Sequence, residues 1–321
     1  MRNAYLAALY DLAKKDNRIL ALVADNGAIV YDKYRQDFGD RFINFGIAES
    51  NMISVAAGLA ACGKIPFTYT ISNFLTMRAF EQIRNDVCMQ KMNVKLVGIG
   101  VGFVYSNLGP THHSVEDIAL MRTLPSMTIF SPADPLEAKE ATIAAAEIQG
   151  PVYLRLATSR TPIIYKDDYE FKAGKGVILR EGRDVSVITT GNITHEVIQA
   201  VDEAANQGIS VRLINLHTLK PIDQNIIVQA SYDTGAILTI EEHTIHGGLG
   251  SSVAAVLLEN NALPVKFKRL GLDDFPSGYG TYQEMKEING LSKEDITGEI
   301  KTLYEAKKDK KSLIDLRDVK I

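Results

Sequence analysis

The chain has 321 residues, 46% hydrophobic and 23% charged, the composition of an ordinary soluble globular protein with room for two domains of about 150 residues. A formal net charge of −4 gives no electrostatic basis for binding nucleic acid or an anionic membrane. The two cysteines lack metal-site or disulfide spacing, and no apolar run approaches the roughly 20 residues that span a bilayer, so a cytoplasmic protein is expected.

Short β-rich runs alternate with helical patterns along most of the chain. Residues 1–16 predict an amphipathic helix rather than a signal peptide. Strands are then predicted at 19–24, 41–45, 65–70, 94–98, 128–131 and 152–156, with helices at 48–62, 73–90, 114–122 and 135–148. Strands separated by helices favour a parallel sheet that is covered on both faces.

A break in this alternation predicts the domain boundary. Residues 161–177 contain Pro162 and the glycines Gly174 and Gly176, so we expect a first domain at 1–162, a linker at 163–180 and a second domain at 181–321. The alternation then resumes, with strands at 184–189, 210–215, 236–241 and 265–269 and helices at 194–207, 222–230 and 247–260. The predicted fold class is two consecutive three-layer α/β/α domains.

Residues that follow strands are the candidates for function, because open α/β sheets bind ligands beyond the carboxyl ends of their strands. Glu49 follows one strand at a helix start, where it either complements the helix dipole or is a semi-buried carboxylate suited to proton exchange. The run after the next strand contains Phe74, Met77 and Phe80. These side chains are either core residues at helical spacing or the walls of a flat apolar slot for a heteroaromatic ring.

Two further places carry polar candidates. Glycines at alternate positions in 98–102 allow close approach of a ligand, without a Walker or G-x-G-x-x-G pattern, and His112 follows in a Gly-Pro-Thr-His-His run. Two adjacent histidines do not by themselves make a metal site. Arg155 and Arg160, at and just beyond the last strand of the domain, could bind a phosphate or carboxylate or form a structural ion pair.

Together and in this order, these places resemble the C-terminal half of the transketolase family, which includes 1-deoxyxylulose-5-phosphate synthase and split, two-subunit transketolases. The matching runs are FGIAESNMISVAAGLAACG at 45–63, SNFLTMRAFEQIRND at 72–86, GPTHHSVEDIALMRTLPSMTIFSPAD at 109–134 and EEHTIHGGLGSSVA at 241–254. The resemblance implies a pyrimidine-binding domain followed by a transketolase C-terminal domain, the latter remote from the reacting atoms, with structural roles for its histidines.

The resemblance implies thiamine diphosphate as the cofactor. Glu49 matches the glutamate that hydrogen-bonds N1′ of the aminopyrimidine ring. That bond favours the imino tautomer, whose 4′-nitrogen takes the proton from thiazolium C2, and the cofactor then acts as the electron sink. Phe74 matches an aromatic residue that stacks on the pyrimidine, and Phe80 and Met77 are further cofactor-binding candidates.

The same resemblance implies how substrate is bound. His112 matches the histidine that contacts substrate oxygen atoms near the reacting carbons, and Arg160, with Arg155 as the fallback, resembles the arginine that holds the terminal phosphate. Leu108 is a departure, because conventional transketolases carry an aspartate there that reads a sugar hydroxyl. An apolar side chain cannot accept that hydrogen bond, so the donor and acceptor sugars stay open.

A missing motif predicts a partner. Full-length family members hold Mg²⁺ and the diphosphate with a Gly-Asp-Gly motif, and this sequence contains none. An N-terminal transketolase subunit should therefore supply the metal ligands, with the active site between subunits and, by analogy, two copies of each chain in the assembly.

Three hypotheses about function remain at this point. The first is two-carbon ketol transfer between phosphorylated sugars, and the second is a β-type subunit of a 2-oxo acid decarboxylase or dehydrogenase, or an acyloin synthase. The G-P-T-H-H-S-V-E-D run favours the first, while Leu108 lends weight to the second. The third is a non-catalytic binding subunit, against which the joint presence of Glu49, Phe74 and His112 argues.

Overall fold

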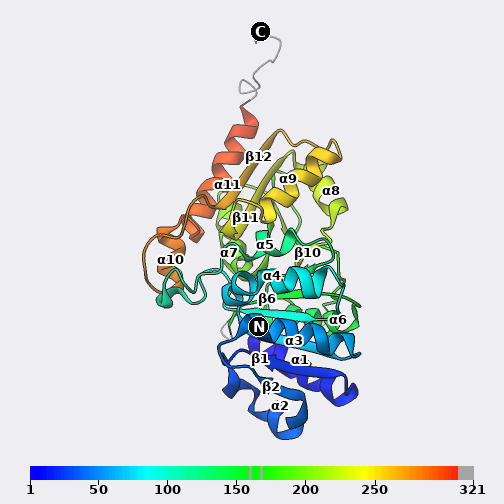
Figure 1. The fold of residues 1–321 in the computed structure, drawn as a ribbon. Coiled ribbons are helices and arrows are strands. Elements are labelled where there is room, and N and C mark those ends of the chain that lie inside the picture. Colours follow the sequence, from blue (N-terminus) through cyan, green and yellow to red (C-terminus); the bar gives the residue numbers. More distant parts are fainter. Residues whose placement is uncertain (159–160, 167–168, 310–321) are drawn as a thin grey trace, which may run out of the picture.

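The computed structural model describes residues 1–158, 161–166 and 169–309. In Figure 1 these residues form one α/β domain at the blue end of the chain and a second at the red end. Each domain is built on its own mostly parallel sheet, so the predicted fold class is confirmed. Within the described residues, no helix is both long enough and apolar enough to cross a membrane.

The first domain contains a 7-stranded sheet in the order β10-β5-β6-β4-β3-β1-β2. Its strands are β1 (Ile19–Val23), β2 (Phe42–Asn44), β3 (Ile65–Ile71), β4 (Lys95–Ile99), β5 (Thr128–Phe130), β6 (Val152–Leu156) and β10 (Thr218–Lys220). All neighbouring pairs are parallel except β10 with β5, and β10 comes from the second half of the chain. Every residue of β1, β3, β4 and β6 is buried, as expected for strands covered on both faces.

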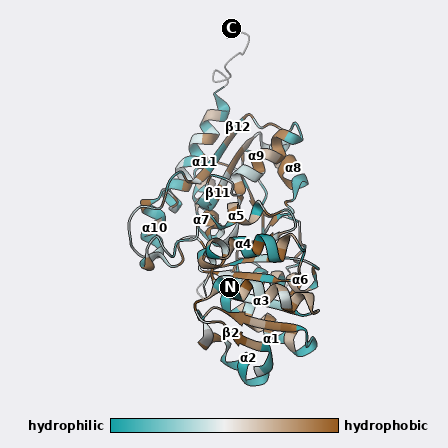
Figure 2. Cartoon of the chain, viewed as in Figure 1, coloured by the Kyte–Doolittle hydropathy of each residue, from teal (hydrophilic) through white to brown (hydrophobic). Residues whose placement is uncertain are grey.

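Helices cover both faces of this sheet. Helices α1 (Arg2–Lys15) and α6 (Pro135–Glu147) pack on one face, through Tyr5, Leu9, Ala138 and Ala141. Helix α3 (Glu49–Ala61) and the segment after β3 pack on the other, and the short helices α2 (Asp32–Asp37) and α5 (Asp117–Arg122) complete the domain. Figure 2 shows the central strands in brown and the exposed α2 in teal.

The segment after β3 differs from the single helix predicted at 73–90. It consists of a π turn at Phe74–Arg78, the short helix α4 (Phe80–Gln82) and a second π turn at Ile83–Cys88. A π turn holds one more residue than an α turn, and such turns are frequent at functional sites. The added residue changes which side chains share a face, so helical spacing alone misplaces residues such as Phe80.

The second domain has a 5-stranded sheet in the order β12-β11-β8-β9-β7. Its strands are β7 (Val177–Arg180), β8 (Val185–Thr189), β9 (Val211–Asn215), β11 (Ala236–Thr244) and β12 (Lys266–Leu272). Strand β7 lies within the range expected as a linker and pairs antiparallel with β9, whereas the other pairs are parallel.

Helices again cover both faces of the second sheet. Helices α7 (Thr194–Asn206) and α11 (Lys293–Lys308) pack on one face, and α8 (Gln224–Thr234) and α9 (Leu249–Glu259) on the other. The α8–α9 side belongs to the same hydrophobic cluster as α3 of the first domain, so the two domains share a core. Helix α10 (Tyr282–Ile288) extends from this domain beside the first.

Candidate active site

The site begins with a buried carboxylate at a helix start. Glu49 is the first residue of α3, only 4% exposed, and Ala48 before it makes no side-chain cap. A carboxylate in the first turn is stabilised by the positive end of the helix dipole. Its Oε1 accepts a hydrogen bond from Arg78 Nη1 at 3.1 Å, so Glu49 is held by a side chain from the π turn after β3.

Aromatic rings continue the site from this ion pair. The Arg78 guanidinium lies 4.0 Å from the centroid of the Phe74 ring, and Phe74 meets the ring of His112 edge-on at 5.1 Å and 66°. Glu49, Arg78, Phe74 and His112 therefore form a continuous group, which we call the Glu49 cluster. Its members follow β2, β3 and β4, whose carboxyl ends lie at one edge of the sheet.

A pocket of about 440 Å³ adjoins the Glu49 cluster. Two of its lining residues, Phe275 and Pro276, come from the loop between β12 and α10 of the second domain. The second domain therefore contributes to the candidate site, which the expectation of a remote domain did not include. The full lining is Asn73, Phe74, Met77, Arg78, Pro110, Thr111, His113, Val115, Glu116, Phe275 and Pro276.

Hydrogen bonds between polar groups link the walls of this pocket. Asn73 Nδ2 donates to the Thr111 carbonyl, while Asn73 Oδ1 is buried with no partner among the described residues. Thr111 Oγ1 lies 3.0 Å from His112 Nδ1. Burial lowers the pKa of His113 and so favours its neutral form, and its Nε2 donates to the Ser106 carbonyl at 3.3 Å.

The other cofactor and substrate candidates are placed differently. Met77 lines the pocket and is 41% exposed, whereas Phe80 is partly buried against the core between α3 and the sheet. Leu108 ends the 3₁₀ turn Ser106–Leu108 with 49% of its surface exposed and is not among the lining residues. Arg160 lies outside the described residues.

Arg155 is a core residue rather than a member of the pocket. Its side chain is 2% exposed, and its Nε donates to Asp117 Oδ2 at 2.8 Å. The same Asp117 oxygen accepts from Tyr153, which bonds Ser72, which in turn accepts from Ser114. Of the two roles expected for Arg155, the structure contains the ion pair, which uses the guanidinium and buries it beneath the site.

Sequence reasoning missed Arg78, Asn73 and the two second-domain residues. Arg78 stands four residues after Phe74 in the quoted run SNFLTMRAF, a spacing that places residues on one helical face. Asn73 directly precedes Phe74. Nothing in the local pattern around Phe275 points to the first domain, so only the tertiary structure shows this contribution.

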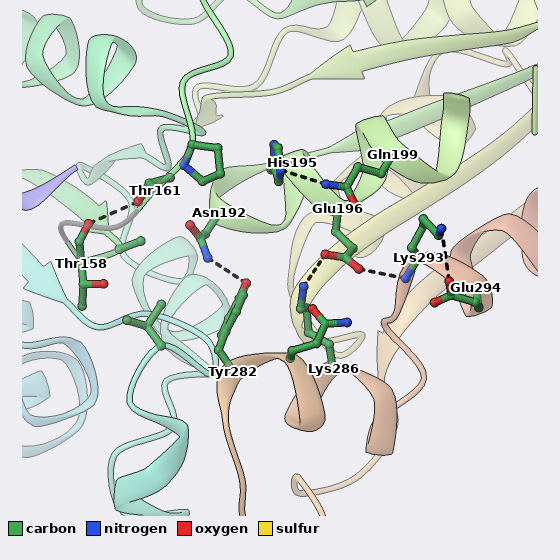
Figure 3. Close-up of a pocket in the computed structure, with 14 residues that line it drawn as sticks. Thr158, Thr161, Asn192, His195, Glu196, Gln199, Tyr282, Lys286, Lys293 and Glu294 are labelled. Atoms are coloured by element: carbon green, nitrogen blue, oxygen red, sulfur yellow. Dashed lines mark hydrogen bonds and ion pairs between the residues drawn. The ribbon is translucent and has the colours of Figure 1, made fainter. Parts of the chain in front are cut away.

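A larger hollow of about 650 Å³ lies between the domains. Figure 3 shows its lining from the end of β6, from the start of α7 and from α10 and α11, with Glu196 between Lys286 and Lys293. No predicted site residue is among its described lining residues, so we take the smaller pocket as the candidate site.

Comparison with known proteins agrees with this architecture. The model of the transketolase pyrimidine-binding domain matches residues 1–162, and that of the transketolase C-terminal domain matches residues 174–296. The chain belongs to the transketolase family. The enzyme class is therefore that of the thiamine-diphosphate-dependent transketolases, and the chain is a transketolase-type subunit.

Its relatives place it more narrowly among split transketolase subunits. It is 39% identical to the 6-deoxy-6-sulfo-D-fructose transketolase subunit SqwH of Clostridium sp. (strain MSTE9), with 92% of each chain covered. It is 35% identical to a subunit of the apulose-4-phosphate transketolase of Actinobacillus succinogenes, covering 92% of this chain and 96% of that one. A solved split-gene transketolase, described as an inactive β4 tetramer, is 38% identical with a TM-score of 0.86, covering 95% and 98%.

The pocket fits the pyrimidine end of thiamine diphosphate when it is taken together with Glu49, which adjoins it through Arg78 but, like His112, is not among its lining residues. A flat ring with hydrogen-bond donors needs an apolar face and acceptors, and the site offers the Phe74 ring, the Glu49 carboxylate and the unpartnered Asn73 Oδ1. A diphosphate with Mg²⁺ needs a cluster of oxygen ligands. Among residues 1–158, 161–166 and 169–309, no group of three or more His, Cys, Asp or Glu could hold a metal ion.

Proposed function

We propose that this chain is the C-terminal subunit of a two-subunit transketolase that transfers a two-carbon ketol unit from a ketose to an aldose. The observation that carries the proposal is the Glu49 cluster, which sets a buried carboxylate and an aromatic face beside a histidine at the carboxyl edge of the sheet. In the reaction, the C2–C3 bond of the ketose breaks and C2 bonds to the aldehyde carbon of the acceptor.

The predicted site residues divide into those that bind the cofactor and those that bind substrate. Glu49 would accept a hydrogen bond from the aminopyrimidine and so favour the tautomer that can move a proton, while Phe74 and Met77 would supply apolar contacts to the ring. When bound, the cofactor supplies the electron sink for the carbon–carbon bond that breaks. His112 orients the substrate oxygen atoms through hydrogen bonds, and Arg160 holds an anionic substrate end.

The names of two relatives support a proposal for the substrate class. The Clostridium subunit is named for a sulfonated ketose and the Actinobacillus subunit for a phosphorylated one. Both substrates carry a strongly acidic group, so we propose an anionic ketose as the donor for this chain. A planar guanidinium suits either a phosphate or a sulfonate.

A partner completes the proposed enzyme. The described residues offer a slot for a pyrimidine but no metal cluster for a diphosphate, and the similar proteins are named as subunits. We therefore propose an N-terminal partner with the Gly-Asp-Gly motif, Mg²⁺ bound by that partner, and two copies of each chain.

Calorimetric titration tests whether the cofactor site is shared between the two subunits. Thiamine diphosphate with Mg²⁺ is titrated into this chain alone, into the N-terminal subunit alone and into the mixture. We expect tight binding by the mixture only, followed by ketol transfer from an anionic ketose to an aldose phosphate. Tight binding by this chain alone would place the diphosphate site here and end the split-enzyme proposal.

The apolar side chain of Leu108 favours one second candidate, an acyloin synthase or 2-oxo acid decarboxylase subunit. Leu108 is half exposed on the loop that leads to His112, where a sugar-reading carboxylate would otherwise stand. The same mixture, supplied with pyruvate, separates the two activities, because only this candidate releases CO₂ from it.

A further inference from the structure

The loop that carries His112 is held by a carboxylate of the second domain. Glu242, in β11, is 3% exposed, and its Oε1 accepts the backbone N–H of Phe103 at 2.5 Å. The other oxygen, Oε2, accepts from the Tyr282 hydroxyl at 2.7 Å. Tyr282 begins α10 and also accepts from Asn192 Nδ2 at 2.7 Å, as Figure 3 shows. One buried carboxylate thus joins β11 and α10 to the first domain.

The backbone of Gly102 lies very close to the Glu242 carboxylate. Gly102 has φ +60°, and a Cβ placed on it would lie 2.3 Å from Glu242 Oε1. Gly102 also exchanges both backbone hydrogen bonds with Ser114, at 2.8 and 3.0 Å. Residues 102–114 are therefore a closed loop, and Glu242 holds the loop at its base.

Phe103, at the base of this loop, contacts the histidine pair that lies near the C-terminal end of the loop. The Phe103 ring meets the ring of His113 edge-on at 5.6 Å and 82°, and His113 lies 3.3 Å from the Ser106 carbonyl. Since His112 precedes His113, a shift of Phe103 moves the backbone that positions His112. The second domain also contacts the outer part of the loop, where a Cβ on Gly109 would lie 2.6 Å from the Tyr279 ring. In Figure 1 the 3₁₀ turn of this loop reaches α10.

Glu241, the residue before Glu242, provides a matched control for the role of Glu242. Glu241 is also fully buried in β11, but its oxygens accept the backbone N–H groups of Leu249 at 2.6 Å and Gly250 at 2.8 Å. It therefore caps the start of α9 and makes no hydrogen bond to the loop. Removing either carboxylate leaves buried N–H groups without a partner, which is destabilising in both cases.

We propose that Glu242 is a positioning residue that holds His112 in register with Glu49 and Phe74. This rests on the proposed function, because it assigns His112 a contact with substrate. Glu242 acts through the Phe103 amide and the closed loop, not by touching substrate. The second domain is then part of the catalytic apparatus, since it fixes the geometry of a residue in the first.

The test uses the full chain with its N-terminal partner and compares Glu242→Ala with Glu241→Ala. We expect Glu242→Ala to lower kcat/KM about tenfold to a hundredfold, because small displacements of positioning groups cost that much. Glu242→Gln keeps an acceptor for the Phe103 amide and should stay within about threefold of wild type, and Glu241→Ala within about twofold at 25 °C. Should Glu242→Ala not fold, Glu242→Asp, which draws the acceptor back by one methylene, replaces it.

A double-variant cycle separates positioning from mere stability. In a His112→Ala background, Glu242→Ala should lower kcat/KM by less than about twofold, although its effect on the melting temperature persists. An equal loss in both backgrounds would overturn the proposal.

Amide hydrogen exchange gives a readout that needs no activity. In the chain alone, Glu242→Ala should speed exchange in residues 102–113, and Glu241→Ala in the first turn of α9. If the wild-type pair shows no ketol transfer, the proposed function fails, whereas equal exchange in 102–113 for both variants defeats the role of Glu242 independently.

Discussion

Arg78 donates a hydrogen bond to Glu49 at 3.1 Å while its guanidinium carbon lies over the Phe74 ring, 4.0 Å from the ring centroid. The same arginine thus covers both groups that a pyrimidine ring would use. Its side chain is half exposed, so it can leave at small cost. Binding of the cofactor to this chain and its partner should therefore displace Arg78.

Replacing this arginine tests the competition directly. Arg78→Met should tighten thiamine-diphosphate binding by the two-subunit mixture about threefold to tenfold, because a cation–π contact and a partly exposed ion pair no longer compete. Titration calorimetry of the mixture measures the change, with Arg84→Met, outside the Glu49 cluster, as the control. Weaker binding by Arg78→Met would mean that Arg78 contacts the cofactor instead.

Glu49→Gln should abolish turnover while leaving the fold intact. The amide cannot replace a carboxylate in holding the aminopyrimidine tautomer, and loss of a general acid–base group costs about 10²–10⁴ in kcat. Because the partner arginine is half exposed, the melting temperature should barely change. Steady-state kinetics measure kcat for Glu49→Gln. The control is Glu81→Gln, on the exposed side of α4. Near-normal turnover would remove Glu49 from the proton-moving role.

Leu108→Asp should shift preference toward hydroxylated aldose acceptors. The side chain is 49% exposed at the end of its turn, so the added carboxylate needs little desolvation and can accept a sugar hydroxyl. The ratio of kcat/KM for two aldoses that differ by one hydroxyl reports the shift, and Leu108→Asn distinguishes charge from hydrogen bonding. An unchanged ratio would mean that residue 108 does not face substrate.

His243 should make the free energy of unfolding depend on pH. Burial lowers its pKa to about 4, its Nδ1 lies 2.7 Å from the Thr244 carbonyl, and its Nε2 accepts from the Ala119 amide. The unfolded chain binds this proton below about pH 6.5 while the folded chain does not, so stability is present above that pH and falls as pH drops toward 4.

A variant isolates this contribution from the other titrating groups. The destabilisation caused by His243→Gln should shrink by up to about 2 kcal/mol between pH 7 and pH 5, because only the wild type loses stability through this proton. Urea unfolding at both values measures it, and His195→Gln, at the partly exposed start of α7, is the control. If His243→Gln destabilises the chain equally at both pH values, His243 is protonated in the folded state.

The sequence patterns predicted the repetitive part of this fold well. Strand β1 is a continuous apolar run, and β6 departs from one only at Arg155, as burial on both faces predicts. Helix α11 was missed despite a local signal, since Ser292 and Asp295 form a capping box at its start. Strand β10 gives no such signal, because three residues that join another domain's sheet carry no periodicity.

Part of the candidate site was predictable because the strands that precede it could be recognised in the sequence. Glu49, Phe74, Met77 and His112 follow strands, and strand ends are visible in sequence. The two roles considered for Arg155 could not be separated from sequence, because its partner Asp117 is 38 residues away, on an element with no local relation to β6. Phe275 lines the pocket and Glu242 bonds the Phe103 amide, both from the second domain, so these contacts depend on how the two sheets pack together.

Strand β10 has a practical consequence for building chimeric enzymes. Thr218–Lys220 pairs with β5 in the first sheet, although β9, which precedes it, and α8, which follows it, belong to the second domain. A crossover placed between the domains would give the first sheet a foreign edge strand and a foreign half of the shared core. Exchange with related subunits should therefore transplant this whole region as one module, with any junction outside it.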